Sequence, residues 1–246
     1  MHSKGKPSAA EMRRDYDICT MYILITAATS KEIQQTIDFI NEENDALKNH
    51  EIKVLITGIG SVSTTYFLTD FINKKKPDII LQAGIAGCFS NKNLGEVVVI
   101  KDDFFGDVGV VENNTFKTIF DLNLMNENDA PFINGTLLNP NKKLLALSML
   151  DEVRSITNNE ITTNAERINF YKQNYAPVVE SMEGAACHYV CLQKNIPFLQ
   201  LRSISNYIGE RDKTKWNFKD AIHTLNEKLI FILQEIIKKD EAYFRI

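Results

Sequence analysis

The sequence predicts an α/β fold formed by a single domain. Short apolar runs alternate with stretches of helical periodicity between residues 22 and 87, and several of these runs end in small or glycine-rich turns. This alternation is typical of a parallel sheet whose strands are connected by right-handed helical crossovers. The chain also contains no internal repeat and no low-complexity linker, so we expect one domain over residues 21–246.

The first part of the expected domain has three strands and two helices. Each apolar run is too short for a buried helix, and a turn separates it from the next segment of helical periodicity. We expect strands at 22–28, 52–57 and 79–83 and helices at about 29–40 and 61–75. The strands end in Ala27-Ala28, Gly58-Ile59-Gly60 and Gly84-Ile85-Ala86-Gly87.

The second part begins with a strand at 95–100 and then loses its regularity. Residues 103–140 are rich in Asn, Asp and Phe, and we expect them to form an excursion over the functional site, because long loops in compact domains are usually functional. Beyond this segment, the pattern predicts helices at 144–153, 183–194 and 218–238 and strands at 160–164 and 198–205.

Composition and charge exclude several classes of function. The chain has 28 Lys and Arg against 32 Asp and Glu, a net charge of −4, and 44% of its residues are apolar. Such values are ordinary for a globular protein and provide no basic surface for nucleic acid. No apolar run approaches the ~20 residues of a membrane-spanning helix. We therefore expect neither nucleic acid nor a membrane as a partner.

The N-terminal segment and the cysteines indicate the cellular setting. Residues 1–20 lack the apolar stretch of a secretory signal, and we interpret them as a polar extension, either disordered or left over from expression. Cys19, Cys88, Cys187 and Cys191 form no disulfide-rich pattern, so a reducing cytoplasm is the simplest setting. No second ligand pair of the usual spacing accompanies Cys187 and Cys191, so we expect no metal site.

The glycine-rich turns are candidates for ligand contact. In open α/β sheets, ligands bind beyond the carboxyl ends of the strands, where glycines let backbone N–H groups approach them. The turn at 58–60 lacks the third glycine of a dinucleotide fingerprint, and no P-loop is present. Each turn could also be only a tight connection between a strand and a helix.

Three polar positions have both a structural and a chemical interpretation. Thr29-x-x-Glu32 fits a capping box, but Glu32 also follows a strand end, where a carboxylate can orient and deprotonate a water. Glu183 suits the dipole of the helix it opens, but with Met182 it also suits a ribose, through apolar contact and acceptance from two hydroxyls. Asn206 can satisfy its turn or present an amide to the edge of a heterocycle.

Together these motifs resemble the nucleoside phosphorylase/nucleosidase superfamily over residues 22–238. The segments MEGAA at 182–186 and RSISN at 202–206 and the two glycine turns occur in the superfamily's order. Within it, ITAATSKEI at 25–33, ESMEGAA and SNYIGERDKTKW at 205–216 are most similar to the futalosine hydrolases, nucleosidases of the alternative menaquinone pathway. The resemblance implies a three-layer α/β/α fold with a mixed, mostly parallel central sheet, and a homo-oligomer, most simply a homodimer.

Carried over residue by residue, the resemblance implies a role for each matching position. Glu32 matches the carboxylate that activates the attacking water, and Met182 and Glu183 match the pair that contacts the ribose. Asn206 matches the position at the purine N7 edge, where methylthioadenosine/S-adenosylhomocysteine nucleosidases have Asp. An Asn cannot deliver a proton, but its amide can bond N7 and O6 of a 6-oxopurine, which fits hypoxanthine. The remaining substrate-binding candidates are Gly84, Ser205 and Trp216, the last of which could instead belong to the core.

The arginines bear on the identity of the nucleophile. A phosphorylase must bind a phosphate dianion, usually through Arg, yet no arginine lies between Arg14 and Arg154. Water is therefore the expected nucleophile, and no cofactor is needed. The sequence thus predicts a nucleosidase that cleaves futalosine to hypoxanthine and dehypoxanthine futalosine. A methylthioadenosine/S-adenosylhomocysteine nucleosidase, a purine nucleoside phosphorylase and a non-catalytic nucleoside-binding protein are the alternatives.

Overall fold

The computed structural model describes residues 21–246, other than 43–46, 48, 114, 240 and 245–246. The polar extension expected at 1–20 lies outside the described residues. The strands of the main sheet are β1 (Tyr22–Ala27), β2 (Glu51–Ile56), β3 (Ile79–Cys88), β4 (Val97–Asp103), β7 (Leu137–Leu138), β8 (Glu152–Thr157), β9 (Val179–Ser181) and β10 (Phe198–Tyr207). A separate hairpin is formed by β5 (Gly109–Glu112) and β6 (Thr115–Thr118).

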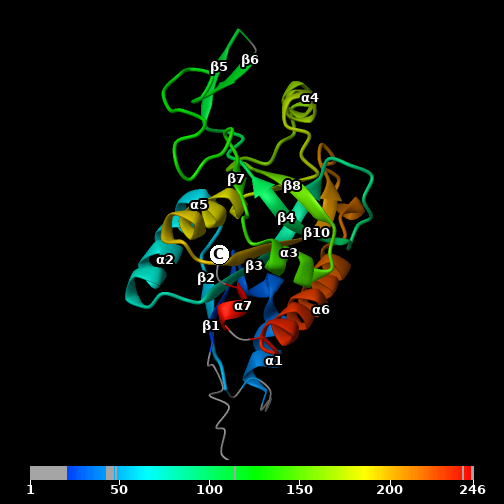
Figure 1. Ribbon diagram of the computed structural model, residues 1–246. Helices are drawn as coiled ribbons and strands as arrows, with labels where there is room; N and C mark the ends of the chain where they lie inside the picture. The colour runs from blue at the N-terminus through cyan, green and yellow to red at the C-terminus, as the bar shows by residue number, and fades with distance from the viewer. Residues whose placement is uncertain (1–20, 43–46, 48, 114, 240, 245–246) are drawn as a thin grey trace, which may run out of the picture.

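Helices flank the main sheet on both sides (Figure 1). The α-helices are α1 (Gln34–Asn41), α2 (Ser61–Lys74), α3 (Lys142–Ser148), α4 (Ala165–Asn174), α5 (Gly184–Lys194), α6 (Phe218–Ile236) and α7 (Glu241–Phe244). Two 3₁₀ turns, η1 (Ser30–Glu32) and η2 (Lys213–Lys215), precede α1 and α6. The helix expected from residue 29 is therefore divided into η1 and α1.

The sheet is mixed and mostly parallel, as predicted. Parallel pairs join β1 to β2 and β3, β3 to β10, and β8 to β4 and β9, whereas β10–β4, β3–β9 and β4–β7 are antiparallel. Because β3 pairs with both β10 and β9, the strands β3, β10, β4, β8 and β9 close into a ring. This closure gathers the ends of β3, β9 and β10 at one edge of the sheet, next to the end of β1.

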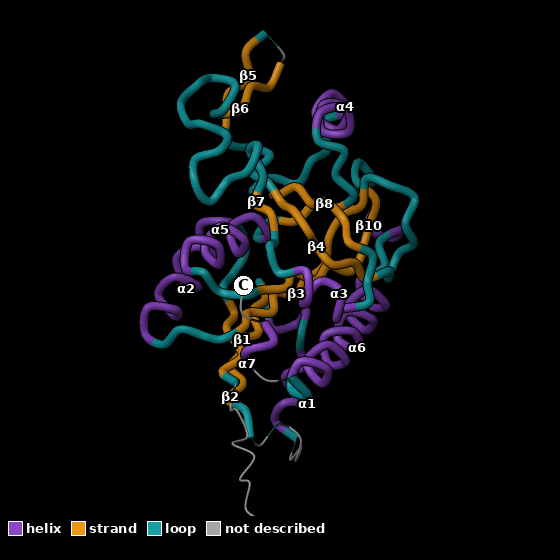
Figure 2. Tube along the Cα trace, viewed as in Figure 1, coloured by secondary structure: helices purple, strands orange, loops and turns teal. Residues whose placement is uncertain are grey.

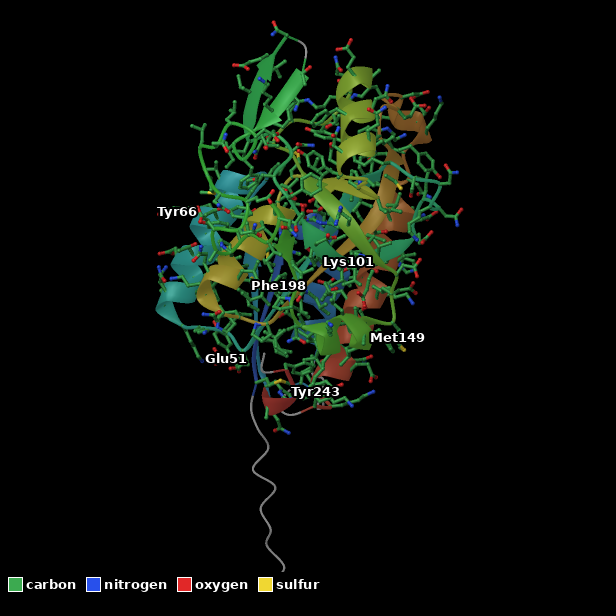
Figure 3. The ribbon with its side chains drawn as sticks, turned by 45° about the horizontal axis from the view of Figure 1, so that its top comes forward. Glu51, Tyr66, Lys101, Met149, Phe198 and Tyr243 are labelled. Atoms are coloured by element: carbon green, nitrogen blue, oxygen red, sulfur yellow. The ribbon has the colours of Figure 1, made fainter. Side chains whose placement is uncertain are left out.

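Alternating side chains of β1 contribute to a hydrophobic cluster on each face of the sheet. Ile23 and Ile25 pack with Leu229 and the other buried residues of α6, whereas Leu24 packs with Leu68 of α2 and the cysteines of α5. This is the period-2 pattern of a strand that is buried on both faces. Figure 3 shows one such interior residue, Phe198, deep between the layers. The predicted three-layer arrangement is confirmed.

Two predicted elements are wrong. The helix expected over 144–153 ends at Ser148, because Met149 adopts a left-handed φ of 53°, and residues 152–157 form β8 instead. The strand expected at 160–164 is a loop, although its β-branched residues favour a strand. Its backbone is hydrogen-bonded to a side chain rather than to a sheet, since Thr162 N–H donates to Glu180. Helix α4 was not among the elements predicted from the sequence.

The segment at 103–140 does not cover the sheet edge described above. It leaves β4, forms the β5–β6 hairpin, and returns as β7 alongside β4 (Figure 2). Among the cysteines, Cys88, Cys187 and Cys191 are buried free thiols, whereas Cys19 lies outside the described residues. Across the described part of the chain, no helix has the length and apolar character needed to cross a membrane.

Candidate active site

A cavity of about 360 Å³ opens at the edge where β1, β3, β9 and β10 end. This volume is within the range of small-molecule sites, about 300–1,000 Å³. It brings together six of the seven residues singled out from the sequence, which are Glu32, Met182, Glu183, Ser205, Asn206 and Trp216. These residues come from three distant parts of the chain, at 32, 182–183 and 205–216, so it is the fold that brings them together.

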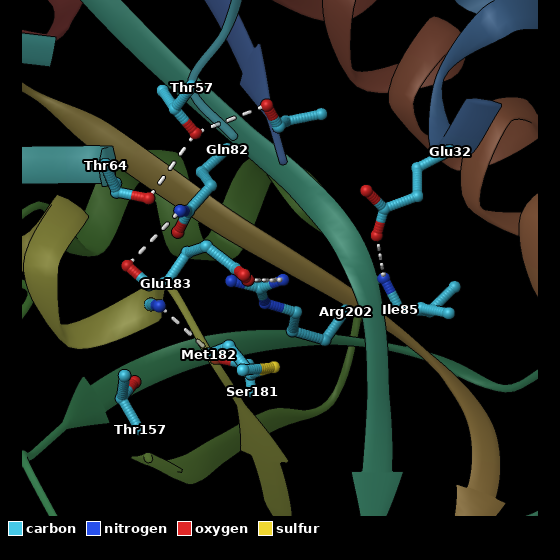
Figure 4. A network of polar contacts seen from close by, with 12 residues as sticks. Glu32, Thr57, Thr64, Gln82, Ile85, Thr157, Ser181, Met182, Glu183 and Arg202 are labelled. Atoms are coloured by element: carbon cyan, nitrogen blue, oxygen red, sulfur yellow. Dashed lines mark hydrogen bonds and ion pairs between the residues drawn. The ribbon is translucent and has the colours of Figure 1, made fainter. Parts of the chain in front are cut away.

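The carboxylate of Glu32 both caps a turn and faces the cavity. Its Oε2 accepts hydrogen bonds from the backbone N–H of Thr29 (3.0 Å) and from the Thr29 hydroxyl (2.9 Å). Its Oε1 accepts from the N–H of Ile85 on β3 (3.2 Å), as Figure 4 shows. Asn226 of α6 donates to the Glu32 carbonyl (2.8 Å). The two interpretations of Glu32 are therefore compatible, because the capping contacts orient the carboxylate toward the cavity.

Glu183 is buried, and both of its carboxylate oxygens have neighbours. Oε1 accepts from the N–H of Gly60 (3.1 Å), a residue 123 positions earlier in the chain. Gly60 has a φ of 91°, which a residue with a side chain rarely adopts. The glycine turn after β2 thus presents a backbone donor to the carboxylate expected to bind ribose. Oε2 lies 3.5 Å from Nη1 of Arg202 (Figure 4).

Arg202 is a residue of the site that the sequence analysis did not identify. It is 2% exposed, and among the described residues it is the one Lys or Arg that is buried. Its side chain lies beneath the cavity and contacts Glu183. An arginine inside the apolar run from 198 to 204 was the available signal, because a charge in a buried strand requires a partner.

Gly84, the seventh predicted residue, does not line the cavity. It lies behind Glu32 and Arg202, and a Cβ atom placed on it would be 2.4 Å from Nη1 of Arg202 and 3.2 Å from Oε1 of Glu32. Its backbone has no left-handed φ, so only the approach of these two side chains requires a glycine. Gly84 therefore provides space for the charged groups beside the cavity.

Replacing Gly84 with Ala should lower kcat/KM of base release at least about tenfold, because the new methyl group displaces Arg202 or Glu32 by a fraction of an ångström to an ångström. The measurement is a steady-state assay with a thermal unfolding curve for each variant. Gly135→Ala is the control: Gly135 has a φ of 71° and lies outside the cavity lining, so that variant should lose stability but keep kcat/KM. Full activity of Gly84→Ala would contradict the steric account.

At the other end of the cavity, Asn206 is fixed by its neighbour. The single hydroxyl proton of Ser205 faces two acceptors, Oδ1 of Asn206 (2.9 Å) and, at a longer distance, the carbonyl of Ala86 (3.2 Å). Nδ2 of Asn206 makes only a long contact, 3.3 Å, with the Tyr207 carbonyl. Gly87 on β3 leaves space for this amide, since a Cβ there would be 3.3 Å from Nδ2.

Apolar side chains complete the cavity. Trp216 lines it, with its indole N–H donated to the Glu210 carbonyl (3.1 Å) and its ring in edge contact with Phe218 (5.3 Å between centroids). It is thus a wall of the cavity rather than a member of the core. Other apolar lining residues include Ile59 and Ile85 of the two predicted glycine turns, and Ile161, Ile208 and Ile222, which were not predicted as site residues. Among the described lining residues, Lys31 is the one Lys or Arg.

Glu180 is a third carboxylate in the cavity lining, and it was not among the residues predicted from the sequence. It accepts from the N–H of Thr162 (3.0 Å), the Thr162 hydroxyl and the amide of Asn158 (2.7 Å). Burial raises the pKa of this carboxyl above its usual range. These contacts bind the loop after β8 to β9, and this loop carries Ile161 into the cavity.

The excursion at 103–140 contributes nothing to this cavity, since none of its described residues is in the lining. A second cavity of about 360 Å³ lies between the β5–β6 hairpin and α4. It contains none of the residues predicted from the sequence; its lining includes Asp107, Phe116, Arg167, Phe170 and Tyr171. The predicted chemistry is therefore concentrated in the first cavity.

Comparisons with known proteins identify the family. One curated relative is a 5'-methylthioadenosine/S-adenosylhomocysteine nucleosidase of Shewanella loihica, 30% identical over 74% of this chain and 80% of the relative. Another is a futalosine hydrolase of Thermus thermophilus, 27% identical over 77% of this chain and 84% of the relative. A solved futalosine hydrolase of Helicobacter pylori superposes with a TM-score of 0.74 at 20% identity over 88% of this chain and 98% of that one, which supports the fold. Residues 23–238 match the family model described as the phosphorylase superfamily. The chain therefore belongs to the phosphorylase superfamily and is an enzyme of its nucleosidase type, an N-glycosidase.

Proposed function

We propose that this enzyme hydrolyses the N-glycosidic bond of futalosine, releasing hypoxanthine and leaving dehypoxanthine futalosine. Its relatives include both futalosine hydrolases and methylthioadenosine/S-adenosylhomocysteine nucleosidases at similar identity, so the choice rests on the residue at the base end of the cavity. That residue is Asn206.

The orientation of the Asn206 amide favours a 6-oxopurine. Because the Ser205 hydroxyl donates to Oδ1, the amide presents its Nδ2 donor to a ligand. N7 and O6 of hypoxanthine are neighbouring acceptors, which one amide nitrogen can bridge. Adenine has an amino group, a donor, in place of O6, so one of the two contacts would be lost. A site built to hydrogen-bond one group rejects the analogue that cannot form that bond.

The charges of the cavity favour water over phosphate as the nucleophile. Glu32, Glu180 and Glu183 line it, and the buried guanidinium of Arg202 already contacts Glu183. A phosphate dianion would therefore meet three carboxylates and, among the described lining residues, the single side-chain cation of Lys31. Phosphate sites are normally built from arginines, whose planar fork matches the phosphate oxygens.

The proposed reaction proceeds through an oxocarbenium-like ribosyl group. As the bond between C1′ and the base stretches, Glu32 deprotonates a water that attacks C1′. Glu183 accepts hydrogen bonds from the 2′- and 3′-hydroxyls, so binding energy away from the reacting bond stabilises the transition state. Hypoxanthine leaves with the electron pair of the broken bond, the Nδ2 donor of Asn206 stabilises the charge that develops on it, and the released base takes up a proton from water.

Incubation of the enzyme with futalosine and with methylthioadenosine, each with and without phosphate, tests the proposal. We expect futalosine to release hypoxanthine whether or not phosphate is present. We also expect kcat/KM for methylthioadenosine to be at least about a hundredfold lower, because binding of adenine leaves a buried polar group of the site without its hydrogen bond. The released base and sugar are identified by liquid chromatography. Equal turnover of methylthioadenosine would support the adenine-releasing alternative, and a requirement for phosphate would support a phosphorylase.

A place in menaquinone biosynthesis and a homodimeric state belong to the same proposal, since the resemblance implies both. Exposed apolar side chains on α2 support the second, because Val62 and Tyr66 extend an apolar surface from Ile59 at the cavity. Tyr66 lies at the periphery of the molecule in Figure 3. Light scattering of the purified protein measures the subunit number.

A further inference from the structure

Helix α5 is not capped by the side chain of its own N-cap residue. That residue is Glu183, and its carboxylate accepts no hydrogen bond from the first turn of the helix. An N-cap side chain ordinarily accepts from the second or third N–H of its helix. Here the N–H of Gly184 donates to the hydroxyl of Ser181 (3.3 Å), and the N–H of Ala185 donates to the hydroxyl of Thr157 (2.8 Å). Side chains from β9 and β8 therefore replace Glu183 as the cap.

Thr157 makes the shorter of these two contacts. It is the last residue of β8 and is fully buried. Its hydroxyl has a single proton, which it donates to Oδ1 of Asp103 at the end of β4 (3.0 Å). Because the proton is used there, a lone pair of the oxygen is available to Ala185. One hydroxyl thus joins the start of α5 to two strands, and Figure 4 shows Thr157 in the same polar network as Glu183.

The contact with Asp103 does not depend on the charge of that carboxyl. Its Oδ1 accepts from the N–H of Phe104 (2.8 Å) and from Thr157, whereas Oδ2 has no hydrogen-bond partner among the described residues. Burial raises the pKa of Asp103 to about 7, so both forms are populated near neutral pH. In the neutral form the proton resides on Oδ2, and Oδ1 remains an acceptor. The Thr157 hydroxyl is therefore oriented toward Ala185 in both forms.

A small residue allows α5 to begin this close to the strands. A Cβ atom placed on Gly184 would lie 2.3 Å from Oδ2 of Asp103 and 2.1 Å from Nε2 of Gln200 on β10. Any side chain at position 184 would therefore push the first turn of α5 away from β4 and β10. The close approach keeps Ala185 within hydrogen-bond distance of Thr157.

We propose that Thr157 is a positioning residue for Glu183. Since Thr157 caps α5, the carboxylate of Glu183 is free to keep Oε1 on the N–H of Gly60 and to present Oε2 to a ribose hydroxyl. Without the Thr157 hydroxyl, the buried N–H of Ala185 needs another acceptor, and Glu183 supplies one only by turning back toward its own helix, away from the ribose. This inference rests on the proposed nucleoside function.

The test compares Thr157→Val and Thr157→Ser with the wild type. Valine keeps the shape of the side chain without the hydroxyl, whereas serine keeps the hydroxyl. The substrates are the nucleoside that the wild type hydrolyses, futalosine or methylthioadenosine, and its 2′-deoxy analogue, which lacks one of the hydroxyls that Glu183 binds. The ratio of kcat/KM for the ribonucleoside to kcat/KM for the analogue should fall at least about tenfold in Thr157→Val, because small displacements of a binding group have effects of this size or larger. It should stay near the wild-type value in Thr157→Ser.

Thr118→Val is the matched control for loss of a buried hydroxyl. The hydroxyl of Thr118 on β6 also has a double role, since it donates to the carboxylate of Asp121 (2.8 Å) and accepts from the N–H of Asp121 (3.1 Å). Thr118 lies outside the cavity lining. Thermal unfolding should show a lower midpoint for both valine variants, but Thr118→Val should keep the substrate ratio. The ratio is measured on one preparation, so the fraction of folded enzyme cancels.

The outcomes separate the inference from the proposed function. A folded Thr157→Val with the wild-type ratio would overturn the inference and leave the proposed function standing, and so would an equal fall of the ratio in Thr118→Val. A wild type that hydrolyses neither futalosine nor methylthioadenosine would overturn the proposed function and the inference with it. Should Thr157→Val not fold, Thr157→Cys is the second variant. Its thiol is a weak acceptor, so its ratio should fall below that of Thr157→Ser, and an unchanged ratio would overturn the inference.

Discussion

Glu32→Gln should lower kcat of base release by at least about a thousandfold, because the amide cannot take a proton from the attacking water. The carboxylate is the group of the cavity best placed for this step, since its two oxygens are oriented by Thr29 and by Ile85 of β3. KM should change little, because the substitution keeps the size of the side chain. Single-turnover assays with chromatographic detection of the base measure the effect.

The Glu32→Gln variant should remain folded. The amide oxygen can still accept from Ile85, and losing the contacts with Thr29 costs about 1 kcal/mol, the usual value of a helix cap. Glu227→Gln is the control, because Glu227 is an exposed carboxylate on α6 outside the cavity lining. Its turnover should equal that of the wild type. Near-normal turnover by Glu32→Gln would exclude Glu32 as the base.

Asn206→Ala should lower kcat by about 10²- to 10³-fold, equivalent to ~3–4 kcal/mol, the cost of removing one preorganised donor from a developing negative charge. The loss should appear in kcat more than in KM, since the charge on the departing base develops only in the transition state. Steady-state kinetics with futalosine measure both constants.

Asn206→Asp distinguishes base recognition from general damage to the site. A carboxyl group at this position can protonate N7, so the variant should gain adenine release from methylthioadenosine relative to hypoxanthine release from futalosine. Equal losses of kcat/KM on both substrates would show that Asn206 supports the structure of the site but does not discriminate between hypoxanthine and adenine. An increase in futalosine turnover would contradict the preference of the Asn206 amide for a 6-oxopurine.

Much of the fold could be predicted from local patterns. The runs at 22–28 and 198–205 became strands because apolar, β-branched residues buried on both faces of a sheet have a signature within a few residues. The same patterns failed between 144 and 164. There, Met149 adopts a left-handed backbone conformation that the local sequence does not predict. Thr162 forms a hydrogen bond with Glu180, which lies 18 residues away in the chain.

The sequence by itself determined the strand ends, the glycine turns and six of the residues that line the cavity. Each of them belongs to a short motif that can be identified from consecutive residues, without knowledge of their partners in space. Only the tertiary structure decided what surrounds them. Arg202 acquires its role from Glu183, and Glu180 from the loop after β8, and closure of the ring through β3 brings these segments together. Charge–charge and hydrogen-bond interactions act through space, so residues that are distant in the chain share one site once the sheet has closed.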